Sequence, residues 1–347
     1  MTMTADQPKL RLAIVGAGRI TRQSHLPAAL GHPEVECCAL VDSCEQRSLE
    51  VCRDLGVNIP IATQIEDVIE GLDAAVIATP NASHHQIAVA CLSRGVHTLI
   101  EKPMAVGVEQ GQAILLAAER SNAVVAVGYH MRFRQTVTLM KKLLSDGYFG
   151  TIHRFSYTFG TDGGWSPVSG YIMDRKSSGG GVLVVSGSHF INRMLYWFGY
   201  PSSIEYQDDS QGGPEANALI DVEFSKTEKP IRGRIRLSKT VELPAGFVME
   251  TDRGIVVLHD HKDAQITIGE SYDDGCRIQL TIKDGEMPQG DEYELQMNDF
   301  VEACQQGRNP RVGGSEGLES DRFFQQCYAN RMAREMNPFA STAGDAK

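Results

Sequence analysis

The sequence predicts an α/β protein with an N-terminal doubly wound parallel sheet and a C-terminal α+β domain built on a large, mostly antiparallel sheet. Short apolar runs alternate with helix-like segments from Leu10 to about Gly128, which is typical of repeated strand–helix units. Strand-like runs then follow one another closely from Thr151 onward, several of them with alternating polarity. We therefore expect two domains, residues 1–128 and 129–340.

Composition excludes several classes of protein. The chain has 347 residues, a formal net charge of −11 and no long basic run, so nucleic acid is not an expected partner. The first residues lack the basic and apolar regions of a secretory signal, and no apolar stretch approaches the ~18 residues of a membrane span. Eight cysteines without a Cys-x-x-Cys pair predict free thiols in a reducing cytoplasm rather than disulfides or a metal site.

The first strand, Leu12–Val15, ends in Gly16 and Gly18. In a dinucleotide-binding turn the first glycine allows the tight bend, and the second lets the backbone approach a pyrophosphate. The next helix would begin at Arg19 and Ile20 and direct its N-terminal amides at the phosphates. Thr21 replaces the third glycine of this Rossmann fingerprint, a position where a small residue can pack.

The second strand, Cys37–Val41, ends in Asp42. Asp42 stands 21 residues after Thr21, near the offset of about 20 expected for the acid that binds the ribose hydroxyls of NAD. A carboxylate there would repel the extra phosphate of NADP, so NAD is the expected cofactor, although Arg47 close by keeps NADP open.

Two further strands end in polar residues. Ala74–Ala78 is followed by Thr79, Pro80, Asn81 and His84, and His97–Ile100 is followed by Glu101 and Lys102. Ligands of such sheets bind at the carboxyl ends of the strands. Taken alone, the first group also fits a plain turn, and Lys102 also fits an exposed lysine.

Several motifs together resemble the Gfo/Idh/MocA family of sugar and polyol oxidoreductases. The motifs are Gly16-Ala17-Gly18 with His25-Leu26-Pro27, Thr79-Pro80-Asn81 with His84, Glu101-Lys102-Pro103, Gly128-Tyr129-His130-Met131-Arg132-Phe133, Gly179-Gly180-Gly181 with Gly187 and His189, Asp299-Phe300 and Glu316-Gly317. They cover nearly the whole chain in the family's order and spacing. The resemblance implies an open-faced second sheet, with helices on one side and a second subunit commonly packed on the other, and hence a homo-oligomer (dimer or tetramer).

The resemblance also implies the roles of individual residues. Lys102 and His189 are the catalytic candidates. The cofactor candidates are Gly16, Gly18, Arg19, Ile20, Asp42, Thr79, Pro80, Asn81, His84, Glu101, Lys102 and His130. The substrate candidates are Arg132, Trp165, Tyr171, Asp174, Arg175 and Asn192. No metal is implied.

The helix expected to carry His189 follows the turn Gly179-Gly180-Gly181, which we interpret as flexible. An isolated histidine with this pattern would more often belong to the core. Val185 stands where the family commonly has an Asp. Either a carboxylate comes from elsewhere, with Asp174 as one candidate, or the substrate is unusual, or the activity is weakened or different. Further along, helices are expected over Asp291–Gly307 and from Ser315 to about Met336.

The implied reaction is hydride transfer between a nicotinamide and a secondary hydroxyl or keto group of a sugar, sugar derivative or cyclitol. His189 would accept the hydroxyl proton, because an imidazole ordinarily titrates near neutral pH, and Lys102 would orient and polarise the oxygen. Two alternatives stay open: a redox-neutral enzyme that retains NAD and hydrolyses a glycoside, and a sensor of nucleotide or sugar without catalysis.

Overall fold

The computed structural model describes residues 8–163, 170–225, 229–259, 266–269, 278–280 and 291–333. It divides into two compact units. The first contains the residues up to Phe133 together with helix α8 (Glu292–Gln306) and helix α9 (Gly314–Ala329) as far as Arg322. The second runs from Arg134 to the last strand before α8 and resumes at Phe323. We describe each unit by itself.

The first unit contains a six-stranded parallel sheet in the order β3-β2-β1-β4-β5-β6. Its strands are β1 (Leu10–Val15), β2 (Val35–Val41), β3 (Ile61–Ala62), β4 (Ala74–Ile77), β5 (His97–Ile100) and β6 (Val125–Val127). The strand order reverses direction between β1 and β4, the place where sheets of this class bind ligands. This arrangement confirms the doubly wound Rossmann sheet predicted from the sequence.

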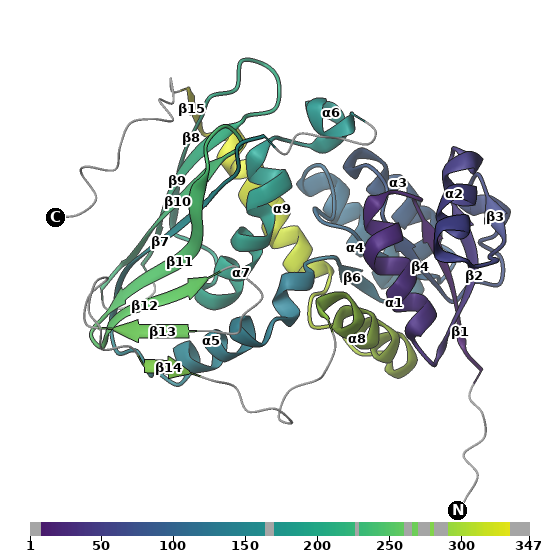
Figure 1. The fold of residues 1–347 in the computed structure, drawn as a ribbon, viewed down its shortest axis with the longest axis horizontal. Helices are drawn as coiled ribbons and strands as arrows, with labels where there is room; N and C mark the ends of the chain where they lie inside the picture. The colour runs from purple at the N-terminus through teal and green to yellow at the C-terminus, as the bar shows by residue number, and fades with distance from the viewer. Residues whose placement is uncertain are drawn as a thin grey trace, which may run out of the picture. The chain divides into compact units, whose positions relative to one another are not determined.

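Both faces of this sheet are covered, which explains why its strands are mostly apolar. Leu12 and Ile14 of β1 pack in one core with Phe300 of α8, whereas Ala13 and Val15 pack in another core on the opposite face. The helical segments are η1 (Thr21–His25), α1 (Leu26–Gly31), α2 (Glu45–Leu55), η2 (Ile65–Asp67), α3 (Asn81–Leu92), α4 (Val108–Ser121) and η3 (His130–Phe133). Figure 1 shows α8 beside α1.

The second unit contains a nine-stranded sheet in the order β14-β13-β12-β11-β7-β10-β9-β8-β15. Most pairs are antiparallel, and the β7–β10 and β8–β15 pairs are parallel. The strands are β7 (Ile152–Gly160), β8 (Ser203–Asp208), β9 (Asn217–Phe224), β10 (Ile231–Ser238), β11 (Leu243–Thr251), β12 (Gly254–His259), β13 (Ile266–Gly269), β14 (Ile278–Leu280) and β15 (Arg331–Ala333). The predicted large, mostly antiparallel sheet is confirmed.

Among the residues that the structure describes, helices cover one face of this second sheet and leave the other face open (Figure 1). Phe190 and Trp197 of the covering helix α7 pack against Tyr157 and Phe247 of the sheet. The other helical segments are α5 (Gln135–Ser145), η4 (Tyr171–Met173), α6 (Arg175–Ser178) and η5 (Leu183–Gly187), which leads into α7 (Ser188–Phe198).

The alternating polarity expected of several strand-like runs is present in β10. Ile231, Ile235 and Leu237 are buried, whereas the Arg232 and Arg234 guanidinium groups lie on the open face. They pair across the strands with carboxylates of β9, at 3.3 Å and 2.7 Å. These cross-strand ion pairs explain how an open sheet face tolerates a row of arginines.

Two boundaries differ from those expected. Helix α9 ends at Ala329, seven residues before the end predicted at Met336, because Arg331–Ala333 pair with β8 and the Arg331 guanidinium lies 2.5 Å from the Asp208 carboxylate. The expected domains were continuous along the chain, whereas the first compact unit takes in α8 and most of α9. The apolar side of α8, with Met297, Phe300 and Val301, packs in the core beside the six-stranded parallel sheet.

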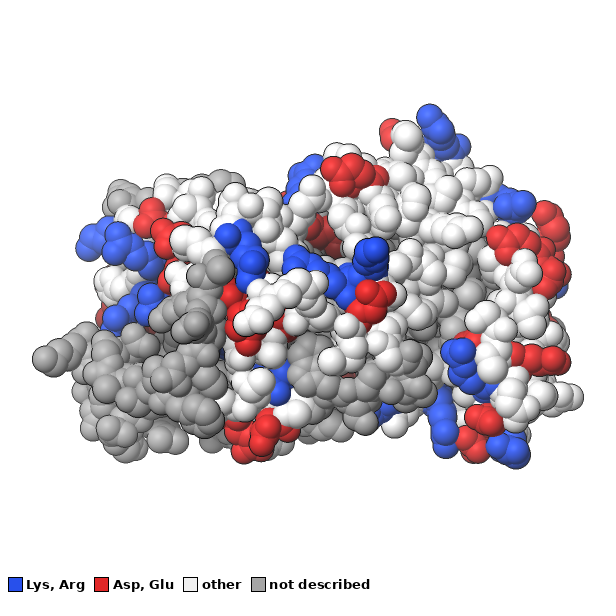
Figure 2. All heavy atoms as spheres, turned by 90° about the horizontal axis from the view of Figure 1, so that it is seen from above, with Lys and Arg blue, Asp and Glu red and all other residues white. Residues whose placement is uncertain are grey.

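Charges of both signs are interspersed over the described residues of the face in Figure 2. In the described parts of the chain, the helices are too short or too polar to cross a lipid bilayer.

Candidate functional site

The parallel sheet brings most of the predicted cofactor residues to one edge. Gly16 follows β1, Asp42 follows β2, Thr79 follows β4, Glu101 follows β5, and His130 comes soon after β6. Because all five strands are parallel, these carboxyl ends meet at the same edge.

The glycine turn is shaped as a phosphate loop requires. Gly16 has a φ of +103°, and a Cβ there would collide with the Ala78 carbonyl, so no other residue fits. A Cβ at Gly18 would meet nothing within 4 Å, so open space faces this position. Thr21 is buried, and its hydroxyl donates to the Gly16 carbonyl at 2.5 Å, which closes the turn that leads into Arg19 and Ile20.

Asp42 lies against this turn. One carboxylate oxygen accepts the Ala17 amide at 2.8 Å, and the other accepts the Cys44 amide at 2.9 Å. The Arg47 guanidinium lies 3.4 Å from the same carboxylate, with a side chain that is 46 % exposed. Asp42 is thus held beside the loop with lone pairs left for ribose hydroxyls. Together with the open space at Gly18, this arrangement fits a bound dinucleotide.

A buried histidine, His84, contacts the loop after β4. His84 is fully buried, and its two ring nitrogens lie 2.9 Å from the carbonyl oxygens of Thr79 and Pro103. Burial lowers the pKa of His84 despite these two carbonyls. His84 therefore joins the loops after β4 and β5. Pro80 precedes the first residue of α3, Asn81, which is itself 6 % exposed.

Glu101 is the centre of a buried charged cluster. Its carboxylate lies 2.8 Å from His25 Nε2 and accepts the Lys102 amide at 3.1 Å. Burial opposes ionisation, but the hydrogen bond and charge of His25, with the charges of Lys102 and His130, lower the pKa of Glu101 to about 2. Glu101 is therefore a fixed anion at neutral pH next to the proposed catalytic lysine.

Tyr293 of α8 completes this cluster, and sequence reasoning missed it. Its ring stacks on His130 with centroids 4.2 Å apart and meets His25 edge-on at 5.5 Å. Arg132 follows His130 within the short helix η3. Nothing in the sequence near Tyr293 signalled this contact, because α8 lies more than 150 residues beyond His130.

The second unit carries the remaining candidates. His189 is half-buried near the start of α7, and Asn192 one turn later is 1 % exposed. Val185 is half-buried within η5, which is a π-helical turn, a feature frequent at functional sites.

The predicted substrate residues before the glycine turn have local partners. Tyr171 begins η4 and is half-buried. Asp174 is exposed and caps α6, where it accepts the Ser177 hydroxyl at 2.5 Å and the Lys176 amide at 3.2 Å; these bonds lower the pKa of Asp174. The Arg175 guanidinium lies 4.6 Å from the Tyr328 ring centroid. Trp165 lies outside the described residues.

Two family models match the chain. The Gfo/Idh/MocA model described as "Oxidoreductase family, NAD-binding Rossmann fold" matches residues 10–129. Its companion, "Oxidoreductase family, C-terminal alpha/beta domain", matches residues 141–335.

Curated relatives and solved structures agree with these models. The NADP(+)-dependent scyllo-inositol 2-dehydrogenase IolW of Bacillus subtilis is 24 % identical over 56 % of this chain and 53 % of its own length, so the chain spans about half the length of this relative. The rhizopine catabolism protein MocA of Rhizobium meliloti is 24 % identical over 95 % of this chain and 97 % of its own. Levoglucosan dehydrogenase in complex with NADH and levoglucosan has the same fold, with a TM-score of 0.79 over 93 % of this chain and 97 % of that one, at 20 % identity.

Proposed function

Because the chain belongs to the Gfo/Idh/MocA oxidoreductase family, we propose that it transfers hydride between NAD and a secondary hydroxyl or keto group of a sugar, sugar derivative or cyclitol. The observation that carries this proposal is the single sheet edge that gathers Gly16, Gly18, Asp42 and the Glu101–Lys102 pair. Two of the similar proteins, an inositol dehydrogenase and a levoglucosan dehydrogenase, support the substrate class.

The bound nicotinamide would supply the hydride acceptor or donor. On oxidation, the substrate carbon loses a hydride, its hydroxyl loses a proton, and a carbonyl forms. His189 takes that proton, and Lys102 orients and polarises the oxygen that carries it. Glu101 supports Lys102, because its carboxylate accepts the Lys102 amide and remains ionised through its contact with His25.

The preference for NAD rests on Asp42. Its carboxylate is fixed by two backbone amides beside the glycine turn, and the Arg47 guanidinium lies 3.4 Å from that carboxylate. A carboxylate at the end of this strand binds the ribose hydroxyls of NAD and repels the extra phosphate of NADP. Asp42→Asn keeps one oxygen acceptor and removes the charge. We expect the wild type to bind NADH at least tenfold more tightly than NADPH, a difference of about 1.4 kcal/mol in binding free energy. In Asp42→Asn, this difference in affinity should become smaller. Equal affinities in the wild type, measured by nicotinamide fluorescence, would refute the preference.

The reaction is tested by the absorbance of reduced nicotinamide. Purified protein is mixed with NAD and pooled polyols, sugars, sugar phosphates and nucleotide sugars, beside a Lys102→Ala variant. A signal that vanishes in Lys102→Ala supports the dehydrogenase and identifies a substrate pool. Silence from every pool with NAD binding retained would reject it in favour of the redox-neutral enzyme or the sensor. Val185, where the family commonly has an Asp, is the feature of this chain that favours the redox-neutral enzyme or the sensor as the alternative.

We also expect a homo-oligomer in the cytoplasm. The open face of the second sheet, opposite its covering helices, is the surface that a second copy would occupy (Figure 1). Light scattering of the purified chain tests the oligomer, and a monomer at micromolar concentration would contradict it.

A further inference from the structure

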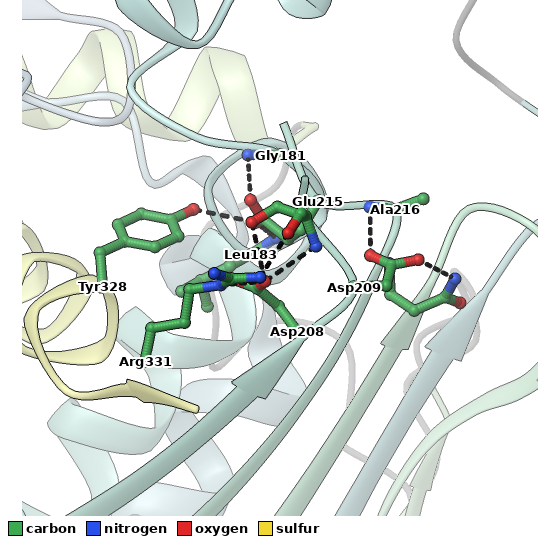
Figure 3. Close-up of polar contacts among 10 residues, drawn as sticks. Gly181, Leu183, Asp208, Asp209, Glu215, Ala216, Tyr328 and Arg331 are labelled. Carbon is green, nitrogen blue, oxygen red and sulfur yellow. Dashed lines mark hydrogen bonds and ion pairs between the residues drawn. The ribbon is translucent and has the colours of Figure 1, made fainter. Parts of the chain in front are cut away.

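A buried glutamate, Glu215, holds the beginning of the helix that carries His189. Its carboxylate accepts the Gly181 amide at 2.9 Å and the Leu183 amide at 3.0 Å; Figure 3 draws both contacts. Its backbone carbonyl accepts the intervening Val182 amide at 2.8 Å. One residue thus binds three consecutive amides, and its own side chain is fully buried.

These three amides lie at the start of a helix, where the helix itself offers no carbonyl oxygen to accept their hydrogen bonds. The helical run that contains η5 and α7 begins at Val182, and the first amides of any helix lack partners within it. In a buried position such amides need an acceptor from elsewhere. Glu215 comes from the loop before β9, so it ties the start of the helix to the sheet.

The glycines of the turn are explained by this contact rather than by flexibility. A Cβ at Gly181 would collide with the backbone of Glu215, and a Cβ at Gly180 would collide with the Tyr328 hydroxyl. We interpreted the glycines as a source of flexibility, and that explanation was wrong. Gly180 and Gly181 instead let the chain approach Tyr328 and Glu215 closely.

Tyr328 of α9 fixes the glutamate in turn. Its hydroxyl donates to the Glu215 carboxylate at 2.9 Å, and its ring lies beneath the Arg175 guanidinium. Burial raises the pKa of Glu215, while hydrogen bonds from Leu183 and Tyr328 oppose this rise. Nearby Asp208 has a separate partner, Arg331 (Figure 3).

We propose that Glu215, with Tyr328 behind it, is a positioning residue for His189. Gly187 of η5 sits against the Leu237 side chain of β10, so the helix rests on the sheet at its first turns and is tied down at its first three amides. The helix start therefore cannot move along the sheet without breaking these bonds. The proposal rests on the proposed function, because His189 needs a defined position only if it exchanges a proton with the substrate.

Three variants test this inference. Glu215→Gln keeps one oxygen for the Leu183 amide and Tyr328 hydroxyl but turns an NH2 group toward one amide donor. Tyr328→Phe removes one donor and leaves both side-chain anchors of the helix. Asp209→Asn is the matched control: Asp209 lies in the same loop and accepts the Ala216 and Asn217 amides at 2.9 Å, which belong to that loop and to β9 rather than to the helix (Figure 3).

The first readout needs no substrate. By hydrogen exchange and mass spectrometry, Glu215→Gln should raise exchange in peptides covering residues 181–189 about fivefold, as loss of one hydrogen bond of ~1 kcal/mol would. Asp209→Asn should leave these peptides unchanged. The reaction rate of His189 with diethyl pyrocarbonate should change in Glu215→Gln and not in Asp209→Asn. Unchanged exchange, or an equal rise throughout the second sheet, would overturn the proposal.

The second readout uses the substrate pool that gives a signal with the wild type. Glu215→Gln should lower kcat about tenfold or more with NADH affinity unchanged, because small misplacement of a catalytic group is costly. The kcat of Tyr328→Phe should lie between that of Glu215→Gln and that of the wild type. An unchanged kcat in Glu215→Gln would overturn the role in catalysis. A wild type that turns over no pool refutes the proposed function instead, and the exchange and histidine-modification results still decide whether Glu215 positions His189.

Discussion

Replacing Glu101 by Gln should reveal how much its buried charge contributes to stability. The Glu101 side chain is 12 % exposed and its partner His25 is 2 % exposed, with 2.8 Å between them. Glutamine keeps the shape and one acceptor but removes the negative charge that faces His25 and the neighbouring Lys102 and His130. It also places an NH2 group on one of the two oxygens that now accept from His25 and the Lys102 amide.

The magnitude follows from the pKa of Glu101, which falls from 4.5 to about 2 in the folded protein. A drop of this size corresponds to about 3 kcal/mol of stability at neutral pH. Because the folded-state pKa is depressed, this contribution is complete above pH 4.5 and is lost as the pH falls toward 2. At pH 3 about half of it should remain.

Thermal unfolding at pH 7 and pH 3 measures this contribution. At pH 7, Glu101→Gln should lower Tm by about 6–12 °C, and at pH 3 by about half as much. Glu119→Gln, which changes an exposed glutamate near the end of α4, should leave Tm unchanged at both pH values. An equal loss in Glu101→Gln at both pH values would refute the reasoning, since packing rather than charge would then account for it.

Three further predictions follow from burial and backbone geometry. Gly16→Ala should lower Tm, since its Cβ collides with the Ala78 carbonyl, whereas Gly18→Ala should keep the wild-type Tm and weaken NADH binding; equal Tm losses in a melting series would contradict this. His84→Leu should cost about 1–3 kcal/mol by leaving a buried carbonyl without its donor, and wild-type stability should fall as the pH drops below 6.5, because burial lowers the pKa of His84; a pH-independent difference in Tm would count against it. Lys239→Met should raise Tm at pH 7, because burial lowers the pKa of Lys239 and so disfavours its charged form; the gain should shrink as the pH rises toward 10.5, and a loss of Tm at pH 7 would contradict it.

The sequence predicted the first sheet closely because its strands are buried on both faces. Strands of this kind appear as short apolar runs, and His97–Ile100 was placed at the bounds that the structure shows. The positions of Gly16, Asp42 and Glu101 at one edge of this sheet were also predictable, because each stands directly after a strand and parallel strands end at one edge. The alternation in β10 predicted its buried and exposed faces for the same reason: a local period of two needs no knowledge of distant partners.

Segments whose structure depends on distant partners were harder to predict. Residues 331–333 were predicted to end a helix, but they form β15. There the Arg331 guanidinium donates to the carboxylate of Asp208, which lies more than a hundred residues earlier in the chain. Tyr293 shows the same limit, since its contacts with His25 and His130 come from the packing of α8 on the first unit. Local propensity carries no information about such pairs.

One device recurs at the loops that carry the candidate chemistry: a buried carboxylate accepts backbone amides from a loop distant in the sequence. Asp42 binds the amide of Ala17, 25 residues away, and Glu215 binds that of Gly181, 34 residues away. Asp321 binds the amide of Ala105, three residues after Lys102 and 216 residues from Asp321 itself. A carboxylate in this role fixes the backbone of a loop without itself bonding to the functional side chains that the loop carries. The sequence displays each acid but not the amide that it accepts. Of these three acids only Asp42 was predicted to belong to the site, because its spacing matches a known fingerprint.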